Sequence, residues 1–439
     1  MNRIYYFLFI IIFISGCSLN KNSKFWSTTE KINQDIGLSE KSLEKKKIFK
    51  KEEVFDKEFN QNLKINISEN LNTNKSLNNY NNNDGVINFD SDLQNTSRYK
   101  FSKIKNFYQY EPTISFDEKN LIFFENKGSI LKFNEKSKLI WKKNYYSKTE
   151  KKLNPVIQFT NNNSFLIVAD NIAKYYMLNI ETGEQIWSKD NLAPFNSQIK
   201  IYKDKFFIVD FSNTLRCFSL KNGNELWNIK TQNSLIRSQK KLSIVIVKDK
   251  IFFNNSIGDI SAVDINKGEL LWQLPTQSSL IYESAFSLES SDIIANNDTL
   301  FFSNNKNQFF SIDIGTGSFN WEAKINSSLR PTLIGNTLFS ISEEGYLFLI
   351  ESSNGNILRV TDVFDNFKIK KRNKIKPTGF ILGGKKIYLS TSNGRLLVID
   401  ISTGKVVSVI KIDNEKILRP IISNENLFVI KDNAIIKLN

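Results

Sequence analysis

The sequence predicts an all-β protein: an eight-bladed β-propeller of four-stranded blades, preceded by a signal peptide and a disordered tether. Three observations favour this fold. A ten-residue pattern ending in tryptophan recurs along residues 103–439, two alternating apolar runs precede each copy, and the copies are one propeller blade apart. Residues 1–102 show none of these features, so we place the domain boundary near residue 103.

Residues 1–16 have the parts of a lipoprotein signal peptide. A basic start at Arg3 precedes the uncharged stretch 4–14, which is shorter than the about 20 residues of a membrane span. The following Ser15-Gly16-Cys17 resembles the lipobox of bacterial lipoproteins, in which the cysteine carries the lipid. Because Ser18 stands where inner-membrane retention uses Asp, the resemblance implies an outer-membrane anchor facing the periplasm. A chance cysteine after a secretory signal is the alternative.

Residues 17–102 are predicted to be the lipidated Cys17 followed by a disordered linker. The segment is rich in Asn, Lys, Ser and Glu, and its apolar residues are too dilute to offset the entropy of ordering the chain. Within it, residues 42–59 alternate charged and apolar side chains. That stretch suggests either a fluctuating amphipathic helix or a docking motif.

The repeat consists of a polar residue, Gly four positions later and Trp after four more. Two clear copies are 178–187, with Asn179, Gly183 and Trp187, and 263–272. The polar side chain can cap its own turn, and Gly can take a left-handed conformation. Five of the six tryptophans fall at the last position, where the ring can cover the neighbouring blade. Two other copies are complete: Ser219/Gly223/Trp227 and Asp313/Gly317/Trp321. Two later copies have another residue in place of Trp: Glu351/Gly355/Arg359 and Asp400/Gly404/Ser408. The earliest copy ends at Trp141 and has Ser137 in place of Gly.

The blade count follows from the spacing of these copies. Successive glycines of the motif are 40, 45, 49, 38 and 49 residues apart, which matches a four-stranded blade. Seven blades are complete in sequence. We expect the eighth to combine strands 419–422, 426–430 and 434–438 with a closing strand near 105–110, so that the two chain ends pair and leave no open edge.

Composition argues against most catalytic chemistry. The chain has no histidine and only two cysteines, Cys17 and Cys217, so the commonest general base and the usual zinc ligands are missing. Cys217 lies in an alternating apolar run and is predicted to be a buried thiol. The net charge of +15 comes from lysines scattered among acids, which indicates a solvated surface rather than nucleic-acid binding. We therefore predict no cofactor, no metal and no catalytic residues.

The repeat resembles the PQQ-type propeller motif, Ala-x-Asp-x-x-Thr-Gly-x-x-x-Trp, over nearly all of 103–439. Two groups of proteins use this motif, the quinoprotein dehydrogenases and the BamB-like lipoproteins of the outer-membrane barrel-assembly machinery. The lipobox and the single propeller resemble the second group. That resemblance implies a non-catalytic scaffold, monomeric within its complex, that binds a POTRA domain of the barrel insertase and associated lipoproteins. A periplasmic module for polysaccharide or another envelope complex, and a PQQ-dependent dehydrogenase, are the alternatives.

The resemblance also implies partner-binding residues. In the family a loop of the form Leu-Ser-Leu-Arg binds the partner, and Leu235-Ile236-Arg237 occupies that connection here, with Ile236 and Arg237 matching its last two positions. An exposed aliphatic beside Arg suits an interface hot spot. The next connection contributes carboxylates in the family, and Glu289 is our candidate, with Glu283 and Asp292 nearby. An ordinary inter-blade connection is the alternative for both.

Overall fold

The computed structural model describes residues 58–65, 82–105, 107, 111–231, 240–276 and 288–439, all within the unit 53–439. The predicted signal peptide and Cys17 lie outside these residues. None of the helices in the described ranges is long and apolar enough to cross a membrane.

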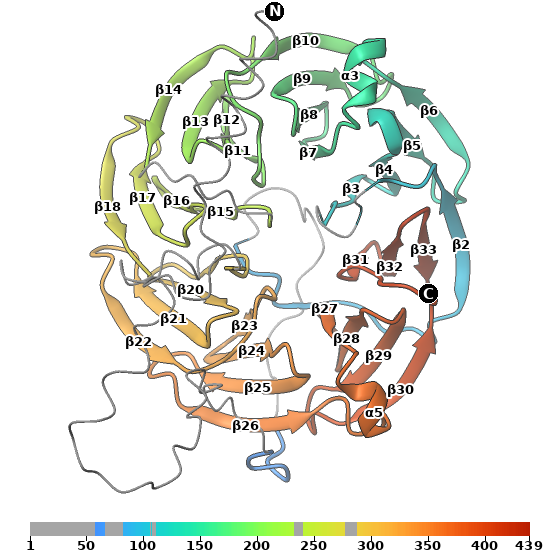
Figure 1. Ribbon diagram of the computed structural model, residues 1–439, viewed down its shortest axis with the longest axis vertical. Helices are drawn as coiled ribbons and strands as arrows, with labels where there is room; N and C mark the ends of the chain where they lie inside the picture. The colour runs from blue at the N-terminus through green and yellow to red at the C-terminus, as the bar shows by residue number, and fades with distance from the viewer. Residues whose placement is uncertain (1–57, 66–81, 106, 108–110, 232–239, 277–287) are drawn as a thin grey trace, which may run out of the picture. The chain divides into compact units, whose positions relative to one another are not determined.

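The described part of the unit 53–439 is a ring of eight sheets, which confirms the predicted propeller (Figure 1). Within each blade the strands run from the axis to the rim in chain order, with the last blade closed by a strand from the other end of the chain. The first four blades are β3 (Ser115–Asp117), β4 (Asn120–Phe124), β5 (Ile130–Phe133) and β6 (Leu139–Lys143); β7 (Ile157–Asn161), β8 (Phe165–Asp170), β9 (Lys174–Asn179) and β10 (Gln185–Asp190); β11 (Lys200–Tyr202), β12 (Lys205–Val209), β13 (Thr214–Ser219) and β14 (Glu225–Lys230); β15 (Ile244–Val247), β16 (Lys250–Asn254), β17 (Ile260–Asp264) and β18 (Leu270–Leu274). The last four are β19 (Ile294–Ala295), β20 (Thr299–Asn304), β21 (Gln308–Asp313) and β22 (Phe319–Ala323); β23 (Thr332–Ile334), β24 (Thr337–Ile341), β25 (Tyr346–Glu351) and β26 (Ile357–Asp362); β27 (Pro377–Gly383), β28 (Lys386–Thr391), β29 (Arg395–Asp400) and β30 (Val406–Lys411); and β31 (Ile421–Ser423), β32 (Asn426–Lys431), β33 (Ala434–Leu438) and β2 (Asn95–Lys100).

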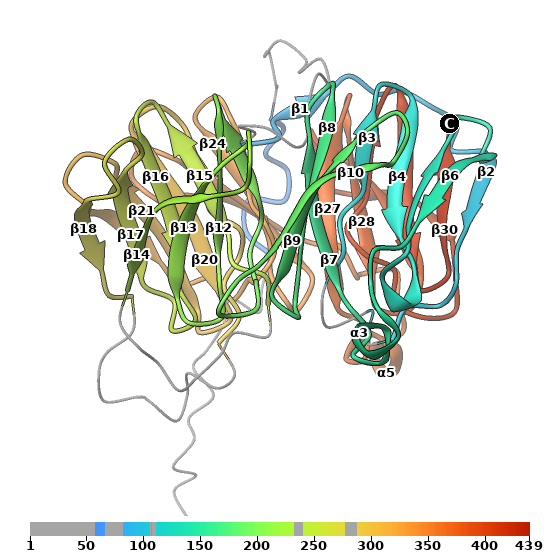
Figure 2. The ribbon, with the colours of Figure 1, turned by 90° about the horizontal axis from the view of Figure 1, so that it is seen from above.

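Burial differs between the middle and outer strands of each blade. The second strand is an almost continuous buried run, as in β8 and β12, because neighbouring blades cover both of its faces. The outermost strand is largely exposed, as in β10 and β30. Short helices lie in two connections between blades: α3 (Lys148–Lys152) and α5 (Ile369–Arg372), which project from the same face of the ring (Figure 2).

The repeated tryptophan joins each of the first five blades to the next. A Cβ added at Gly317 would lie 2.6 Å from the Trp272 ring, so glycine leaves the space that the indole fills. The Trp272 indole N–H also donates to the Ile314 carbonyl at 3.2 Å. Trp141, Trp187 and Trp321 make the same pair of contacts with the following blade, and Trp227 makes the ring contact. The turn also follows the predicted chemistry, since the Asp313 side chain accepts from the Thr316 amide.

Arg359 takes the place of tryptophan between the sixth and seventh blades. It is fully buried, and its guanidinium donates to the carbonyls of Ile401 (3.1 Å) and Ser402 of the next blade. It donates as well to the Leu63 carbonyl at 2.8 Å. The cation therefore satisfies the same carbonyl edge that an indole N–H reaches elsewhere, and it binds the N-terminal segment 58–65 in addition.

The ring closes through a different strand from the one predicted. Residues 101–105 follow the closing strand as a loop, and β2 pairs antiparallel with β33 to complete the eighth blade. The expectation near 105–110 is wrong, because β2 at 95–100 takes the closing position. Ile104 and Phe107 are buried in the core, and residues 106 and 108–110 lie outside the described ones. Of the described side chains of β2, Tyr99 is the buried one, and its ring contacts Phe133 and Phe428. The propeller thus begins before residue 103.

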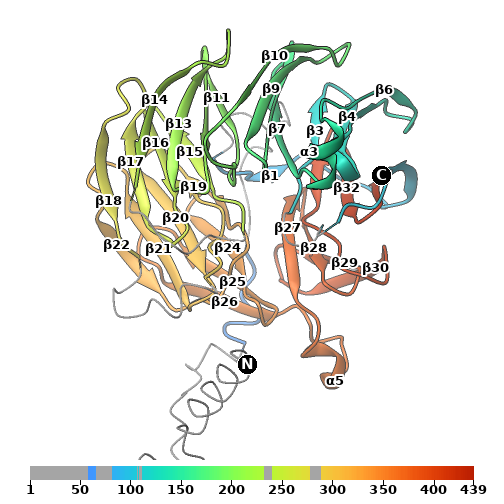
Figure 3. The same cartoon turned by 45° about the horizontal axis from the view of Figure 1, so that its top comes forward.

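Two stretches of the predicted linker pack against the propeller. Phe59 forms an antiparallel bridge with Val360 on the rim strand β26. Residues 82–89 lie along the axis, where the short strand β1 (Val86–Ile87) pairs parallel with the inner strand β27. The inner strands surround the axis in Figures 1 and 3. Because the inner strand of each blade has an unpaired edge there, a polar segment can be ordered by hydrogen bonding to those edges, without the apolar content that the sequence lacks.

Gly317→Ala should destabilise the propeller much more than Gly315→Ala in the same turn. Gly317 has φ of +75° and no room for a Cβ beside Trp272, whereas an added Cβ at Gly315 would only approach the Asp313 carboxylate at 3.2 Å. A non-glycine residue in this conformation costs on the order of 1–3 kcal/mol, to which the displaced indole adds. Urea unfolding monitored by tryptophan fluorescence measures both variants. Equal midpoints would contradict the inter-blade role of Gly317.

Arg359→Trp restores the repeat and should keep the ring stable while releasing the segment 58–65. The indole can donate to the next blade but cannot also reach the Leu63 carbonyl that Arg359 binds. Hydrogen exchange of the Ile65 amide, which donates to the Ser402 carbonyl, should accelerate at least about ten-fold. Unchanged Ile65 exchange would show that Arg359 does not hold this segment.

Candidate functional site

Two connections from the rim of one blade to the axis of the next carry α3 and α5, which project from the same face of the ring (Figure 2). The predicted partner-binding residues fall in two other connections of this kind. Leu235, Ile236 and Arg237 lie outside the described residues, as does Glu283. Glu289 is described and is exposed, and its backbone bonds with Asn305 fix its position at the surface.

Asp292 behaves differently from Glu289, although it is only three residues away. Its carboxylate turns toward the axis and lies 3.8 Å from the Arg330 guanidinium. Burial would raise the pKa of Asp292, but Arg330 and Lys241 outweigh it and hold the pKa below its ordinary value. The structure therefore separates the sequence-predicted carboxylates into one at the surface and one in the axial channel.

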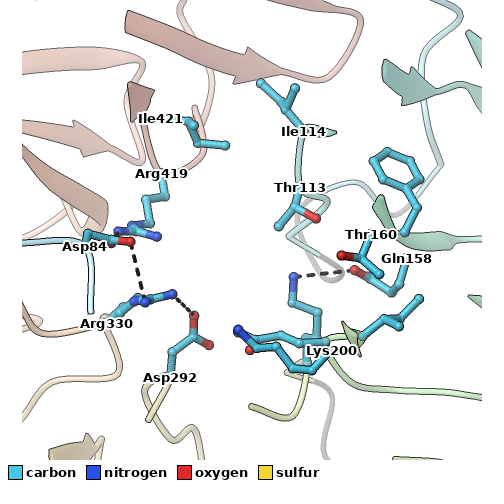
Figure 4. Close-up of a pocket in the computed structure, with 14 residues that line it drawn as sticks. Asp84, Thr113, Ile114, Gln158, Thr160, Lys200, Asp292, Arg330, Arg419 and Ile421 are labelled. Atoms are coloured by element: carbon cyan, nitrogen blue, oxygen red, sulfur yellow. Dashed lines mark hydrogen bonds and ion pairs between the residues drawn. The ribbon is translucent and has the colours of Figure 1, made fainter. Parts of the chain in front are cut away.

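A cavity of about 110 Å³ lies at the axis where the inner strands begin (Figure 4). Seven of the eight blades, or the connections that lead into them, contribute to its wall, and the N-terminal segment contributes Asp84. Four cationic and two anionic side chains are among the described residues that line it. They are Lys200, Lys241, Arg330, Arg419, Asp84 and Asp292.

The repeat itself places these side chains together. Asp292, Arg330 and Arg419 each stand two residues before the inner strand of their blade, and Lys200 opens β11. Inner strands run in the same direction around the ring, so equivalent positions meet at one end of the channel. Lys241 enters from the connection before β15 and donates to the Gln158 side chain at 3.4 Å.

Asp84 of the N-terminal segment is the best-paired charge in the cavity. It is 2% exposed, forms an ion pair with Arg419, and lies 3.5 Å from the Arg330 guanidinium. Burial alone would raise the pKa of Asp84, but the two guanidinium groups outweigh it and lower the pKa to about 2. The carboxylate is therefore ionised at neutral pH.

The residues before Asp84 fix it in this position. The Asn82 side chain bonds both the amide and the carbonyl of Ile246, at 3.2 and 2.6 Å. Asn83 does the same with Leu333, at 2.9 and 2.6 Å. Each side-chain amide thus pairs with the open edge of an inner strand as a neighbouring strand would. The asparagine-rich stretch that the sequence indicated to be linker is, at 82–84, a hydrogen-bonding element.

Lys200 is buried without a matching charge in contact. Its side chain lines the cavity, the residue is 6% exposed, and among the described residues its ammonium has no hydrogen-bond or ion-pair partner. Burial, followed by repulsion from Arg330, lowers the pKa of Lys200 to about 8. Buried ammonium groups of this kind carry a large desolvation penalty.

The cavity does not suit the quinone of the dehydrogenases that share this repeat. Cofactor sites enclose about 300–1,000 Å³, well above the volume found here. Within the described ranges no three carboxylate or thiol side chains cluster where they could hold a metal ion. Cys217, predicted to be a buried thiol, is fully buried, and burial raises its pKa to about 12.

Sequence reasoning named Asp292, as a carboxylate of a docking connection, and missed the other charged residues of the axial cavity. They belong to no motif and carry side chains that are common throughout the chain. A signal exists in retrospect, because charged residues recur shortly before several inner strands, a position that is buried in a propeller. Recognising it requires the register of each inner strand, and those strands are only two to seven residues long.

Lys200→Met should stabilise the protein by about 3 kcal/mol at pH 7 in chloride buffer, because the shift of the lysine pKa from 10.5 to about 8 corresponds to that free energy. The unfolded chain binds the proton more tightly than the folded one. Wild-type stability should therefore rise between pH 8 and 10.5, and the advantage of the variant should vanish over the same interval. Urea unfolding across this range tests it, with the exposed Lys324→Met as control. A pH-independent difference would show that the Lys200 ammonium is not desolvated.

The protein is similar to known proteins over most of the propeller. A family model described as outer membrane protein assembly factor BamB matches residues 126–361, more than half of the chain. The crystal structure of BamB from Moraxella catarrhalis has a TM-score of 0.65 at 15% identity, covering 79% of this chain and 99% of that one. A computationally designed protein, Ika8, has a TM-score of 0.58 at 12% identity, covering 77% of this chain and 99% of its own. Quinohemoprotein alcohol dehydrogenase from Comamonas testosteroni has a TM-score of 0.60 at 8% identity, with coverage of 80% and 78%.

At these identities the structural likenesses show the fold alone. A search of curated proteins finds no match. The family match is more specific, since it runs from within the first blade to the end of the sixth and includes all five inter-blade tryptophans and Arg359. The repeat, the ring of eight blades and this match together show that the chain belongs to the BamB family of PQQ-repeat β-propellers.

Proposed function

We propose that the protein is a non-catalytic scaffold lipoprotein of the outer-membrane β-barrel assembly machinery. The observation that carries the proposal is the match of residues 126–361 to the family described as outer membrane protein assembly factor BamB. A scaffold needs a rigid frame and adaptable loops. The ring supplies the frame, and the connections between blades supply the loops.

In this proposal residues 1–16 are removed and Cys17 carries the lipid that holds the protein on the periplasmic side of the outer membrane. Two or more acyl chains give stable attachment, whereas one is marginal. Glu58 is the first residue described in contact with the propeller, through hydrogen bonding to the Asp362 amide. The chain between Cys17 and Glu58 therefore limits the distance from lipid to propeller to about 140 Å at full extension.

The partner in this proposal is the POTRA region of the barrel insertase, bound on the face that carries α3 and α5. Leu235, Ile236 and Arg237 would supply an aliphatic anchor with an adjacent cation, and the exposed Glu289 a carboxylate in the next connection. Mixed charge at such a rim governs orientation and association rate more than affinity. The scaffold holds the insertase in place and makes or breaks no bond.

The alternatives gain less support. A dehydrogenase needs a cofactor site larger than the axial cavity. A polysaccharide module would use clustered aromatic side chains on one face. Among the described residues, the exposed large apolar side chains are aliphatic except for Phe59 in the N-terminal segment and Phe319 in β22.

Affinity capture from detergent-solubilised native membranes after mild crosslinking tests the function and the loop together. Wild-type protein should recover the barrel insertase, and Ile236→Ala/Arg237→Ala should recover it at least about ten-fold less, as expected for loss of an interface hot spot. Mass spectrometry with labelled reference peptides quantifies the insertase.

The matched control is Ile369→Ala/Lys370→Ala, which removes an exposed aliphatic and its neighbouring cation from α5 on the same face. This variant should capture as much insertase as the wild type. Equal capture by all three proteins would keep the assembly role and reject the loop. Capture of another envelope complex in place of the insertase would reject the assembly role.

A further inference from the structure

Among the described residues that line it, the axial cavity has more positive than negative side chains. Four cations face two carboxylates, and both carboxylates lie beside Arg330. Lys200 has no counter-charge in contact within the described part of the chain. Buried charges are normally paired, so an unpaired ammonium in the wall of a cavity indicates that a mobile anion completes the set.

The volume of the cavity limits the size of such an anion. A dry cavity of about 150 Å³ accommodates benzene, which has six heavy atoms. A cavity of about 110 Å³ therefore suits an anion of four to six heavy atoms. Phosphate, sulfate and oxalate fall in this range, whereas nucleotides and peptides do not.

Asp84 shows that the arginine side of the cavity already accepts an oxyanion. The carboxylate of this residue binds Arg419 and lies 3.5 Å from Arg330, held there by the hydrogen bonds of Asn82 and Asn83. On the opposite side Lys200 and Lys241 present two ammonium groups and the Gln158 amide. Figure 4 shows the two halves facing each other across the cavity.

We propose that this cavity is a binding site for a small oxyanion of the phosphate or short dicarboxylate class, held by Lys200 and Lys241 and by the outer N–H groups of Arg330 and Arg419. Charge-assisted hydrogen bonds from these four side chains provide the recognition. Asp84 competes with the bound anion, because its carboxylate already occupies some of the N–H groups of Arg330 and Arg419. The low pKa of Asp84 keeps that competitor charged throughout the neutral range.

Isothermal titration calorimetry of the full chain in detergent, at pH 7 and constant ionic strength, tests the site with inorganic phosphate as the probe. Wild-type protein should bind one phosphate per chain, and Lys200→Met should bind it at least about ten-fold more weakly. Asp84→Asn should bind phosphate about five-fold more tightly, since the competing charge is gone. Oxalate in a parallel titration distinguishes a carboxylate from a phosphate ligand, and binding of either supports the site.

The exposed Lys324→Met variant controls for general loss of positive charge and should bind as the wild type does. Lys241→Met provides a second cavity variant if Lys200→Met fails to fold, as judged by circular dichroism. Absence of saturable binding of both anions to the wild type would overturn the proposal. Wild-type affinity in the cavity variants, or weaker binding in Asp84→Asn, would place any bound anion elsewhere and overturn it as well.

Discussion

The contact on which the rest of the structure depends lies between the rim of a blade and the turn of the next, and it recurs from the first blade to the sixth. An indole or, once, a guanidinium lies on a glycine that has no Cβ, and in all of these contacts but that of Trp227 it donates to the carbonyl edge of the same turn. A four-stranded sheet alone cannot bury both faces, and this contact brings the next sheet against it. Its repetition places equivalent residues at equivalent heights around the axis. One short motif therefore determines the arrangement of side chains both at the rim and in the channel.

The fold could be predicted from sequence because that motif is local and repeated. Asn179, Gly183 and Trp187 lie within nine residues, and these residue types predict a turn and an inter-blade contact without reference to the rest of the chain. The closing strand and the axial segment could not be predicted in the same way. Tyr99 is the one described buried aromatic of β2, and residues 82–84 are Asn-Asn-Asp, which reads as disorder. What orders them is the unpaired backbone of strands more than 150 residues away, to which no local pattern refers.

The residues of the candidate site also differ in whether the sequence could predict them. The loop residues at 235–237 came from a resemblance and remain a prediction, while Glu289 is placed at the surface as a docking role requires. Of the axial charges, the sequence indicated only Asp292, and that for a docking role; the structure revealed the others. Lys200 and Arg330 are ordinary surface-type residues by composition, and their burial follows from where each inner strand begins. In a propeller, a shift of one residue in where an inner strand begins decides whether a side chain faces the solvent or the axis.

The two regions are connected through the chain. Arg237 is four residues from Lys241, a span of at most about 14 Å, and Asp292 follows Glu289 by three. A protein docked on these connections and an anion held at the axis would therefore act on the same short segments. Thermodynamic linkage then requires reciprocity: whatever factor the anion contributes to the affinity of the partner, the partner contributes to the affinity of the anion. Asp84 enters this relation because it competes for Arg330 and Arg419, and the segment that holds it leads back toward the membrane anchor proposed at Cys17. The N-terminal segment is in this way a constituent of the axial site as well as part of the chain that leads to the lipid proposed at Cys17.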